Sequence, residues 1–92
     1  MSEVIVLTGK NCPNCDMLKQ MLDWWHTEYR TVDVETIEGT ALLSQTQARS
    51  VPILMRVDGV EVKKYVVGIA NRDEQFQAVI EDNTSEAQKE LL

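Results

Sequence analysis

Both cysteines of the chain lie in one tetrapeptide, Cys12-Pro13-Asn14-Cys15. This tetrapeptide stands between an apolar run, Val4-Ile5-Val6-Leu7, and a stretch whose apolar residues recur at helical spacing. Two thiols at this spacing, at the start of a helix, can close a small disulfide and reopen it, whereas a structural bridge joins distant segments. The pattern therefore predicts a reactive dithiol–disulfide pair.

The two thiols are expected to differ in reactivity. Cys12 precedes Pro13, so it should lie at or just before the helix N-cap, where unpaired backbone N–H groups and the helix dipole stabilise a thiolate. Lys10 adds a nearby cation, whereas Cys15 lies one turn further in and has no such help. We expect Cys12 to attack a disulfide and Cys15 to resolve the mixed disulfide that results.

Two other interpretations of the cysteines stay open. One is a buried, inert pair, which the reducing compartment inferred below disfavours. The other is a small metal-binding carrier that uses the two thiolates. A zinc site needs four ligands, and only His26 could add to the two sulfurs. His26 is predicted at the far end of the helix that Cys12 starts, as an exposed last-turn residue, so we expect no metal site.

Composition limits the size and the partners of the protein. Ninety-two residues with a 43% apolar share support one compact domain, predicted over residues 1–82, followed by a short polar tail with helical propensity over 83–92. The start of the chain carries no basic segment and no long apolar run, so we expect a cytoplasmic protein. A formal net charge of −6 disfavours nucleic acid and membrane surfaces as partners. We expect a monomer.

The periodicity of apolar residues predicts four strands and three helices. Asp58-Gly59 predicts a tight hairpin between the last two strands. The last helix is expected to open with a capping box in which Asn71 is the N-cap and Glu74 is its partner. Strands are predicted over Val4 to Leu7, Tyr29 to Val34, Ile53 to Val57 and Val60 to Val67, with helices over Pro13 to Thr27, over Glu38 to Arg49 and after Asn71.

The order β-α-β-α-β-β-α, with Cys-x-x-Cys after the first strand, resembles the thioredoxin fold in its minimal, glutaredoxin-like form. The resemblance implies an α/β protein with a four-stranded mixed sheet flanked by helices. The segment Arg49-Ser50-Val51-Pro52 resembles the Arg-Thr-Val-Pro segment of glutaredoxins. In that family the bond before the proline is cis and faces the sulfurs. The resemblance implies a cis Pro52, a Val51 backbone that pairs with the substrate, and an Arg49 that helps hold the glycyl carboxylate of glutathione.

A third segment, Gly68 to Asp73, corresponds to the region where glutaredoxins hold the γ-glutamyl group of glutathione. The resemblance implies substrate contacts at Gly68, Asn71 and Arg72. The chain departs from the family in three ways. Ile69 replaces a second glycine, Asn14 stands where a tyrosine is common, and Lys10 lies two residues before the first cysteine instead of three.

The chain also departs from thioredoxins, because it lacks the tryptophan before the motif and the buried acid on the preceding strand. The resemblance as a whole implies a glutaredoxin-type thiol–disulfide oxidoreductase that binds no resident cofactor and uses glutathione as a co-substrate. Its expected clients are proteins with disulfides, ribonucleotide reductase among them. The alternative is a thioredoxin-like redoxin that a thioredoxin reductase reduces.

Overall fold

The computed structural model describes residues 2–81, so the tail predicted over 83–92 lies outside the described residues. A four-stranded sheet has the strand order β2-β1-β3-β4, in which β1 and β2 are parallel and the other pairs are antiparallel. The number, order and type of the elements agree with the sequence prediction. In chain order they are β1 (Ser2–Thr8), α1 (Pro13–Trp24), β2 (Arg30–Asp33), α2 (Ile37–Ser44), β3 (Ile53–Asp58), β4 (Glu61–Val67) and α3 (Asp73–Ile80).

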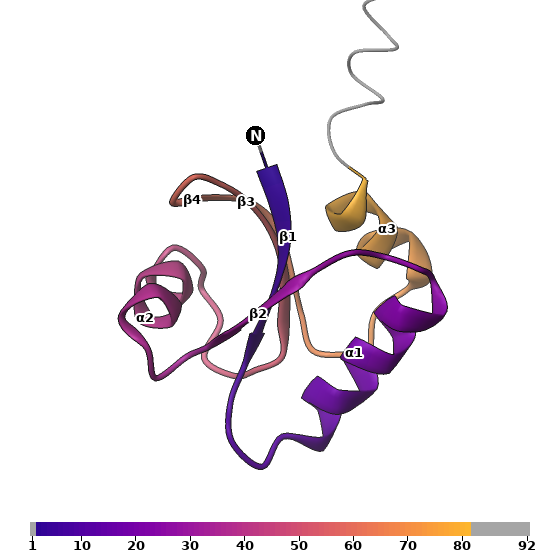
Figure 1. The fold of residues 1–92 in the computed structure, drawn as a ribbon, viewed down its shortest axis with the longest axis horizontal. Helices are drawn as coiled ribbons and strands as arrows, with labels where there is room; N and C mark the ends of the chain where they lie inside the picture. The colour runs from indigo at the N-terminus through magenta and orange to yellow at the C-terminus, as the bar shows by residue number, and fades with distance from the viewer. Residues whose placement is uncertain (1, 82–92) are drawn as a thin grey trace, which may run out of the picture.

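Helices cover both faces of the sheet: α1 and α3 lie on one side and α2 lies on the other (Figure 1). Successive side chains of β1 point to opposite faces. Val4 and Val6 pack with Leu18, Leu22 and Phe76 of the two-helix side, whereas Ile5 and Leu7 pack with Leu42 of α2. Because both faces of β1 are covered, the strand reads as a continuous apolar run.

Helix α1 ends at Trp24, three residues before the predicted end at Thr27. His26 adopts a left-handed conformation with φ of 56°. Its N–H donates to the carbonyl of Asp23, and the N–H of Thr27 donates to the carbonyl of Leu22. These two bonds form a Schellman motif, which is an efficient helix stop. A glycine usually marks this motif in a sequence. Because no glycine is present here, the end of the helix could not be predicted from the sequence.

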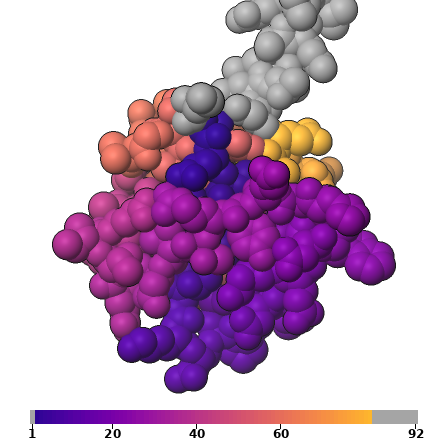
Figure 2. Space-filling view, viewed as in Figure 1, coloured from indigo at the N-terminus to yellow at the C-terminus, as the bar shows by residue number. Residues whose placement is uncertain are grey.

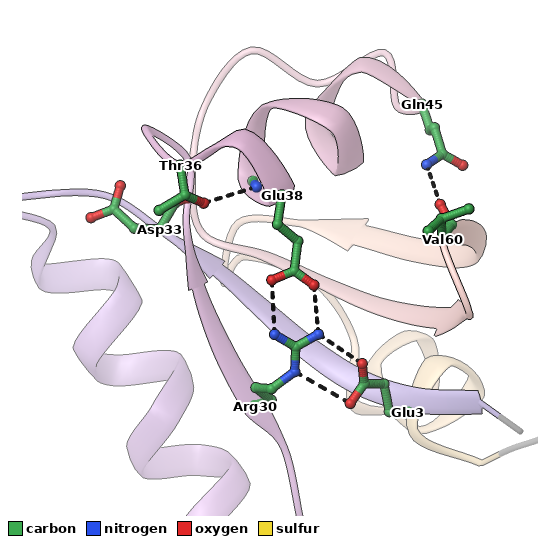
Figure 3. Close-up of polar contacts among 8 residues, drawn as sticks. Glu3, Arg30, Asp33, Thr36, Glu38, Gln45 and Val60 are labelled. Atoms are coloured by element: carbon green, nitrogen blue, oxygen red, sulfur yellow. Dashed lines mark hydrogen bonds and ion pairs between the residues drawn. The ribbon is translucent and has the colours of Figure 1, made fainter.

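Helix α2 is also shorter than predicted: it covers Ile37–Ser44, so it begins one residue before the predicted start at Glu38 and ends five residues before the predicted end at Arg49. Its N-cap is Thr36, whose hydroxyl accepts a hydrogen bond from the N–H of Gly39 at 2.9 Å (Figure 3). Beyond the helix, the hydroxyl of Thr46 donates to the carbonyl of Leu43 at 2.8 Å and turns the chain towards β3. Arg49 therefore lies in a loop and not on the helix.

The predicted capping box of α3 is wrong by one residue. The N-cap is Arg72, and the side-chain oxygen of Gln75 accepts a hydrogen bond from the Arg72 N–H at 3.0 Å. The amide of Asn71 instead donates backwards to the carbonyl of Val67 at 2.8 Å. An arginine side chain has no acceptor, so only the backward half of a capping box is possible here.

An arginine also holds the other end of α3. The buried guanidinium of Arg56, on β3, donates to the carbonyl of Val79 at 3.1 Å and to the carbonyl of Ile80. It also donates to the hydroxyl of Ser2 at 3.1 Å. Helix C-terminal carbonyls lack partners within the helix, and a cation suits the dipole there. Arg56 therefore fixes α3 to the sheet.

A charged network joins β1, β2 and α2 at the end of β1 opposite to the cysteines. Arg30 binds both carboxylate oxygens of Glu38 at 2.9 and 2.7 Å, and both oxygens of Glu3 at 3.3 and 2.8 Å (Figure 3). Hydrogen bonds from Arg30 lower the pKa of both carboxyl groups.

No helix within residues 2–81 is long and apolar enough to cross a membrane.

Candidate redox site

The two cysteines form a disulfide at the start of α1, with their Cα atoms 5.2 Å apart. Cys12 is the N-cap of the helix, as expected, and Pro13 occupies the first helical position. The Cys12 sulfur accepts a hydrogen bond from the N–H of Cys15 at 3.1 Å, and its carbonyl accepts from the N–H of Asp16 at 3.3 Å. The helix start thus offers an N–H group directly to the Cys12 sulfur.

The two sulfur-bearing residues differ in exposure. Cys15 is only 2% exposed, whereas Cys12 is partly exposed. In Figure 2 the segment between β1 and α1 lies at the lower edge of the visible face. A partner molecule can therefore reach Cys12 and cannot reach Cys15 directly.

Three segments that are distant in the sequence meet at this edge of the sheet. The register pairs Leu7 with Ile53, and Ile53 with Val67. The residues after β1, before β3 and after β4 are therefore neighbours. Gly9 approaches Val51 so closely that a Cβ at Gly9 would lie 3.1 Å from a Val51 methyl group. The sheet thus brings the Cys12 loop, the Val51-Pro52 segment and Gly68 together.

The Val51-Pro52 peptide bond is cis, as the resemblance implied. The carbonyl of Pro52 accepts a hydrogen bond from the N–H of Gly68 at 2.8 Å. Within the described part of the chain, the N–H and C=O groups of Val51 make no backbone hydrogen bond. These two groups are therefore available to an extended peptide, which is the role that the resemblance assigned to Val51.

Gly68 has φ of 78°, and a Cβ there would meet no atom within 4 Å. The residue is glycine for its backbone conformation and not for lack of space. Asn71 and Arg72, which the resemblance implied as substrate contacts, lie one residue further from the helix than expected, because α3 begins one residue later. The guanidinium of Arg72 is largely exposed and lies 3.6 Å from the carboxylate of Glu74.

The two cations expected near the cysteines have different surroundings. Arg49 is exposed and makes no hydrogen bond or ion pair with the rest of residues 2–81. The ammonium of Lys10 lies 3.5 Å from a carboxylate oxygen of Glu35, in the turn between β2 and α2. Sequence reasoning missed Glu35, although its place just after the second strand was a usable signal. The ends of parallel strands lie at the same edge of a sheet.

The outer face of α1 carries exposed apolar side chains. Met17 is 53% exposed and Trp24 is 81% exposed. Trp25, by contrast, is partly buried against the core, with its ring centroid 6.4 Å from that of Phe76. Within residues 2–81 no group of three or more His, Cys, Asp or Glu side chains is placed to hold a metal ion.

No protein-family model matches the chain, and no curated protein matches it in sequence. Solved structures do resemble it. A thioredoxin-like protein is 25% identical with a TM-score of 0.62, and the match covers 84% of this chain and 99% of that protein. A glutaredoxin from Archaeoglobus fulgidus is 22% identical with a TM-score of 0.61, covering 89% of each chain. Buckwheat glutaredoxin, solved with glutathione, is 22% identical with a TM-score of 0.59, covering 86% of this chain and 76% of its own.

These likenesses agree with the strand order, the helix positions and the place of the cysteine pair after β1. The protein therefore has the thioredoxin fold, and the Cys12–Cys15 disulfide at the start of its first helix supports a thiol–disulfide redox role.

Proposed function

We propose that the protein is a glutaredoxin-type dithiol–disulfide oxidoreductase that reduces protein disulfides or glutathione mixed disulfides. The observation that carries this proposal is the asymmetry of the cysteine pair. Cys12 is accessible and its sulfur accepts an N–H hydrogen bond at the helix start, while Cys15 is buried one turn away. A hydrogen bond to the charged form lowers the pKa of a thiol.

The reduced protein acts in two exchange steps. The Cys12 thiolate attacks one sulfur of the partner disulfide, which forms a mixed disulfide and releases the other sulfur as a thiolate. Cys15 then loses its proton, and its thiolate attacks the Cys12 sulfur. The partner leaves as a thiol, and the Cys12–Cys15 disulfide forms. Two electrons pass from the protein to the partner, and the buried position of Cys15 keeps the second attack intramolecular.

Glutathione is the proposed source of electrons for the oxidised pair. One glutathione thiolate attacks the Cys12 sulfur and releases Cys15 as a thiolate. A second glutathione thiolate attacks the glutathione sulfur of this adduct, which releases the Cys12 thiolate and forms glutathione disulfide. Lys10, Arg49 and the N–H groups at the start of α3 are the groups that could hold the two carboxylates of glutathione. Val51 would pair with the peptide backbone of glutathione through its own N–H and C=O groups, which make no hydrogen bond within the sheet.

Single cysteine variants test the assigned roles. Cys12→Ser should abolish all thiol exchange, because no accessible sulfur remains. Cys15→Ser should accumulate mixed disulfides and retain turnover of small glutathione adducts, since external glutathione can resolve them. Thiolate absorbance against pH in each variant should give the lower pKa to Cys12. A lower pKa for Cys15 would reverse the two roles.

A second candidate is a redoxin that a flavoprotein thioredoxin reductase reduces. Two observations favour it: Lys10 is already paired with Glu35, and Asn71 is turned back to Val67 instead of capping α3. The deciding experiment compares the oxidised protein with glutathione plus glutathione reductase, and with thioredoxin reductase, each with NADPH. Reduction only in the second mixture would reject the glutathione proposal. Ribonucleotide reductase is a proposed client in either case.

A further inference from the structure

The carboxylate of Glu35 lies beside the redox loop. Its oxygen is 3.5 Å from the ammonium of Lys10, two residues before Cys12, and both side chains are mostly exposed, at 65% and 75%. The pair sets one negative charge against one of the two cations near the cysteines.

One backbone hydrogen bond joins the turn that carries Glu35 to the end of β1, and a side-chain hydrogen bond shapes the turn itself. The N–H of Val34 donates to the carbonyl of Thr8 at 2.8 Å, which joins the end of β2 to the end of β1. The N–H of Glu35 donates to a carboxylate oxygen of Asp33 at 2.8 Å. The Glu35 backbone is therefore held close to the end of β1, and its carboxylate reaches Lys10 from there.

We propose that Glu35 is a specificity-determining residue of the redox site, which lowers the preference for anionic disulfides by neutralising Lys10. The inference rests on the proposed disulfide exchange at Cys12. A substrate carboxylate has to displace Glu35 before it can bind Lys10, and it also meets the Glu35 charge. A cationic substrate instead gains an attractive carboxylate beside Lys10, in the loop that leads to Cys12.

Three small disulfides of different charge test the proposal with the fully reduced protein. Glutathione disulfide is anionic, cystamine is cationic and hydroxyethyl disulfide is neutral. Each oxidises the dithiol to the Cys12–Cys15 disulfide and yields two thiols, so no other reductant is needed. The measured quantity is the second-order rate constant of this reaction at low salt.

Glu35→Gln should raise the rate constant for glutathione disulfide by about two- to fivefold, which is the range of an exposed ion pair. It should lower the rate constant for cystamine by a similar factor and leave hydroxyethyl disulfide unchanged. Both changes should shrink as the salt concentration rises, because the groups are exposed. In the Lys10→Gln background, Glu35→Gln should give a smaller gain for glutathione disulfide, since the partner of the carboxylate is missing.

Glu61→Gln is the matched control. Glu61 is an exposed carboxylate that pairs with Lys63 at 3.3 Å, and it lies by the hairpin at the other end of the sheet. This variant changes the net charge equally and should leave all three rate constants unchanged within error. An equal effect of Glu35→Gln and Glu61→Gln would show a net-charge effect and overturn the proposal. An equal rise for all three disulfides would place the effect on the Cys12 thiolate and also overturn it.

The outcome is separable from that of the proposed function. If glutathione and its reductase fail to turn over the protein, the glutathione-dependent function is rejected, and the charge preference measured with the three disulfides still stands or falls by itself. If turnover occurs and Glu35→Gln shows no difference between anionic and cationic disulfides, only the role of Glu35 is rejected.

Discussion

Gly39→Ala should destabilise the protein, although alanine is the better helix former. Gly39 lies in the first half of α2, where the helix crosses the end of β2. A Cβ built there would lie 2.0 Å from the carbonyl oxygen of Asp33 and 2.8 Å from the Cα of Val34. Both contacts are with backbone, so no side chain can rotate away. Helix and strand would have to separate by roughly 1.5 Å to restore an ordinary contact.

Two effects of opposite sign set the magnitude. Replacing glycine by alanine within a helix normally stabilises it by about 1 kcal/mol. Forcing an extra methyl group into a packed site costs about 1–3 kcal/mol, and rigid surroundings favour the upper end. The helix shift would also disturb the hydrogen bond from the Gly39 N–H to the hydroxyl of Thr36, a cap worth about 1 kcal/mol. We expect a net loss of about 2–3 kcal/mol.

Urea denaturation of the oxidised protein measures this loss. Ala41→Gly is the control, because Ala41 is an exposed position of the same helix. It should cost about 1 kcal/mol through helix propensity alone. A Gly39→Ala protein that is as stable as the original, or more stable, would refute the close packing of α2 on β2. The displaced turn should also slow disulfide exchange, since Val34 of that turn is bonded to Thr8 beside the redox loop.

Four further predictions concern stability. Trp24→Ala should change the free energy of unfolding by less than about 0.5 kcal/mol, because the side chain is 81% exposed. Trp25→Ala should cost about 2 kcal/mol or more in the same urea experiment, since its ring packs on the core. Gly68→Ala should cost about 1–2 kcal/mol from its positive φ alone, and a D-alanine at this position, introduced by chemical synthesis, should restore the stability. The Arg30 hydrogen bond holds the pKa of Glu3 below its usual value, so its stabilising effect is present above the unfolded pKa and is lost as the pH falls through the folded pKa. For such an exposed pair this stabilising effect is about 0.2–1 kcal/mol. In the Glu3→Gln variant its loss at acidic pH should be absent, and thermal unfolding curves recorded between neutral and acidic pH measure this.

The elements that pack against one another could be predicted from the sequence. The apolar run in β1 is long because both faces are covered, and Asp58-Gly59 indicated the hairpin that Gly59 makes with φ of 65°. Helix ends were harder, because they depend on single backbone conformations. His26 adopts a left-handed φ without being glycine, and Asn71 uses its amide on Val67 instead of on α3. The sequence alone does not show which of two possible backbone groups such a side chain will bind.

In the candidate site, too, the features that belong to short sequence motifs could be predicted. The Cys12 N-cap and the cis bond at Pro52 belong to motifs within a few residues of the sequence, and both lie where they were expected. Trp24 and Trp25 are adjacent and chemically identical, yet one is exposed and the other packs on Phe76. Their difference follows from the helical period of α1, because Trp25 lies seven residues after the buried Leu18 and three after the buried Leu22, whereas Trp24 lies off that stripe.

The ion pair between Lys10 and Glu35 shows why substrate specificity is harder to predict from a sequence than the fold. Lys10 could be identified from the sequence as a cation near the cysteines, but its partner could not. Its pairing with Glu35 depends on the parallel register of β1 and β2, which brings the ends of two strands together across 25 residues of sequence. The core residues fix that register, and the loops then carry charges that burial does not constrain. If Glu35 has the proposed role, this domain changes its preferred disulfide through one exposed acid while the Cys12–Cys15 pair stays the same.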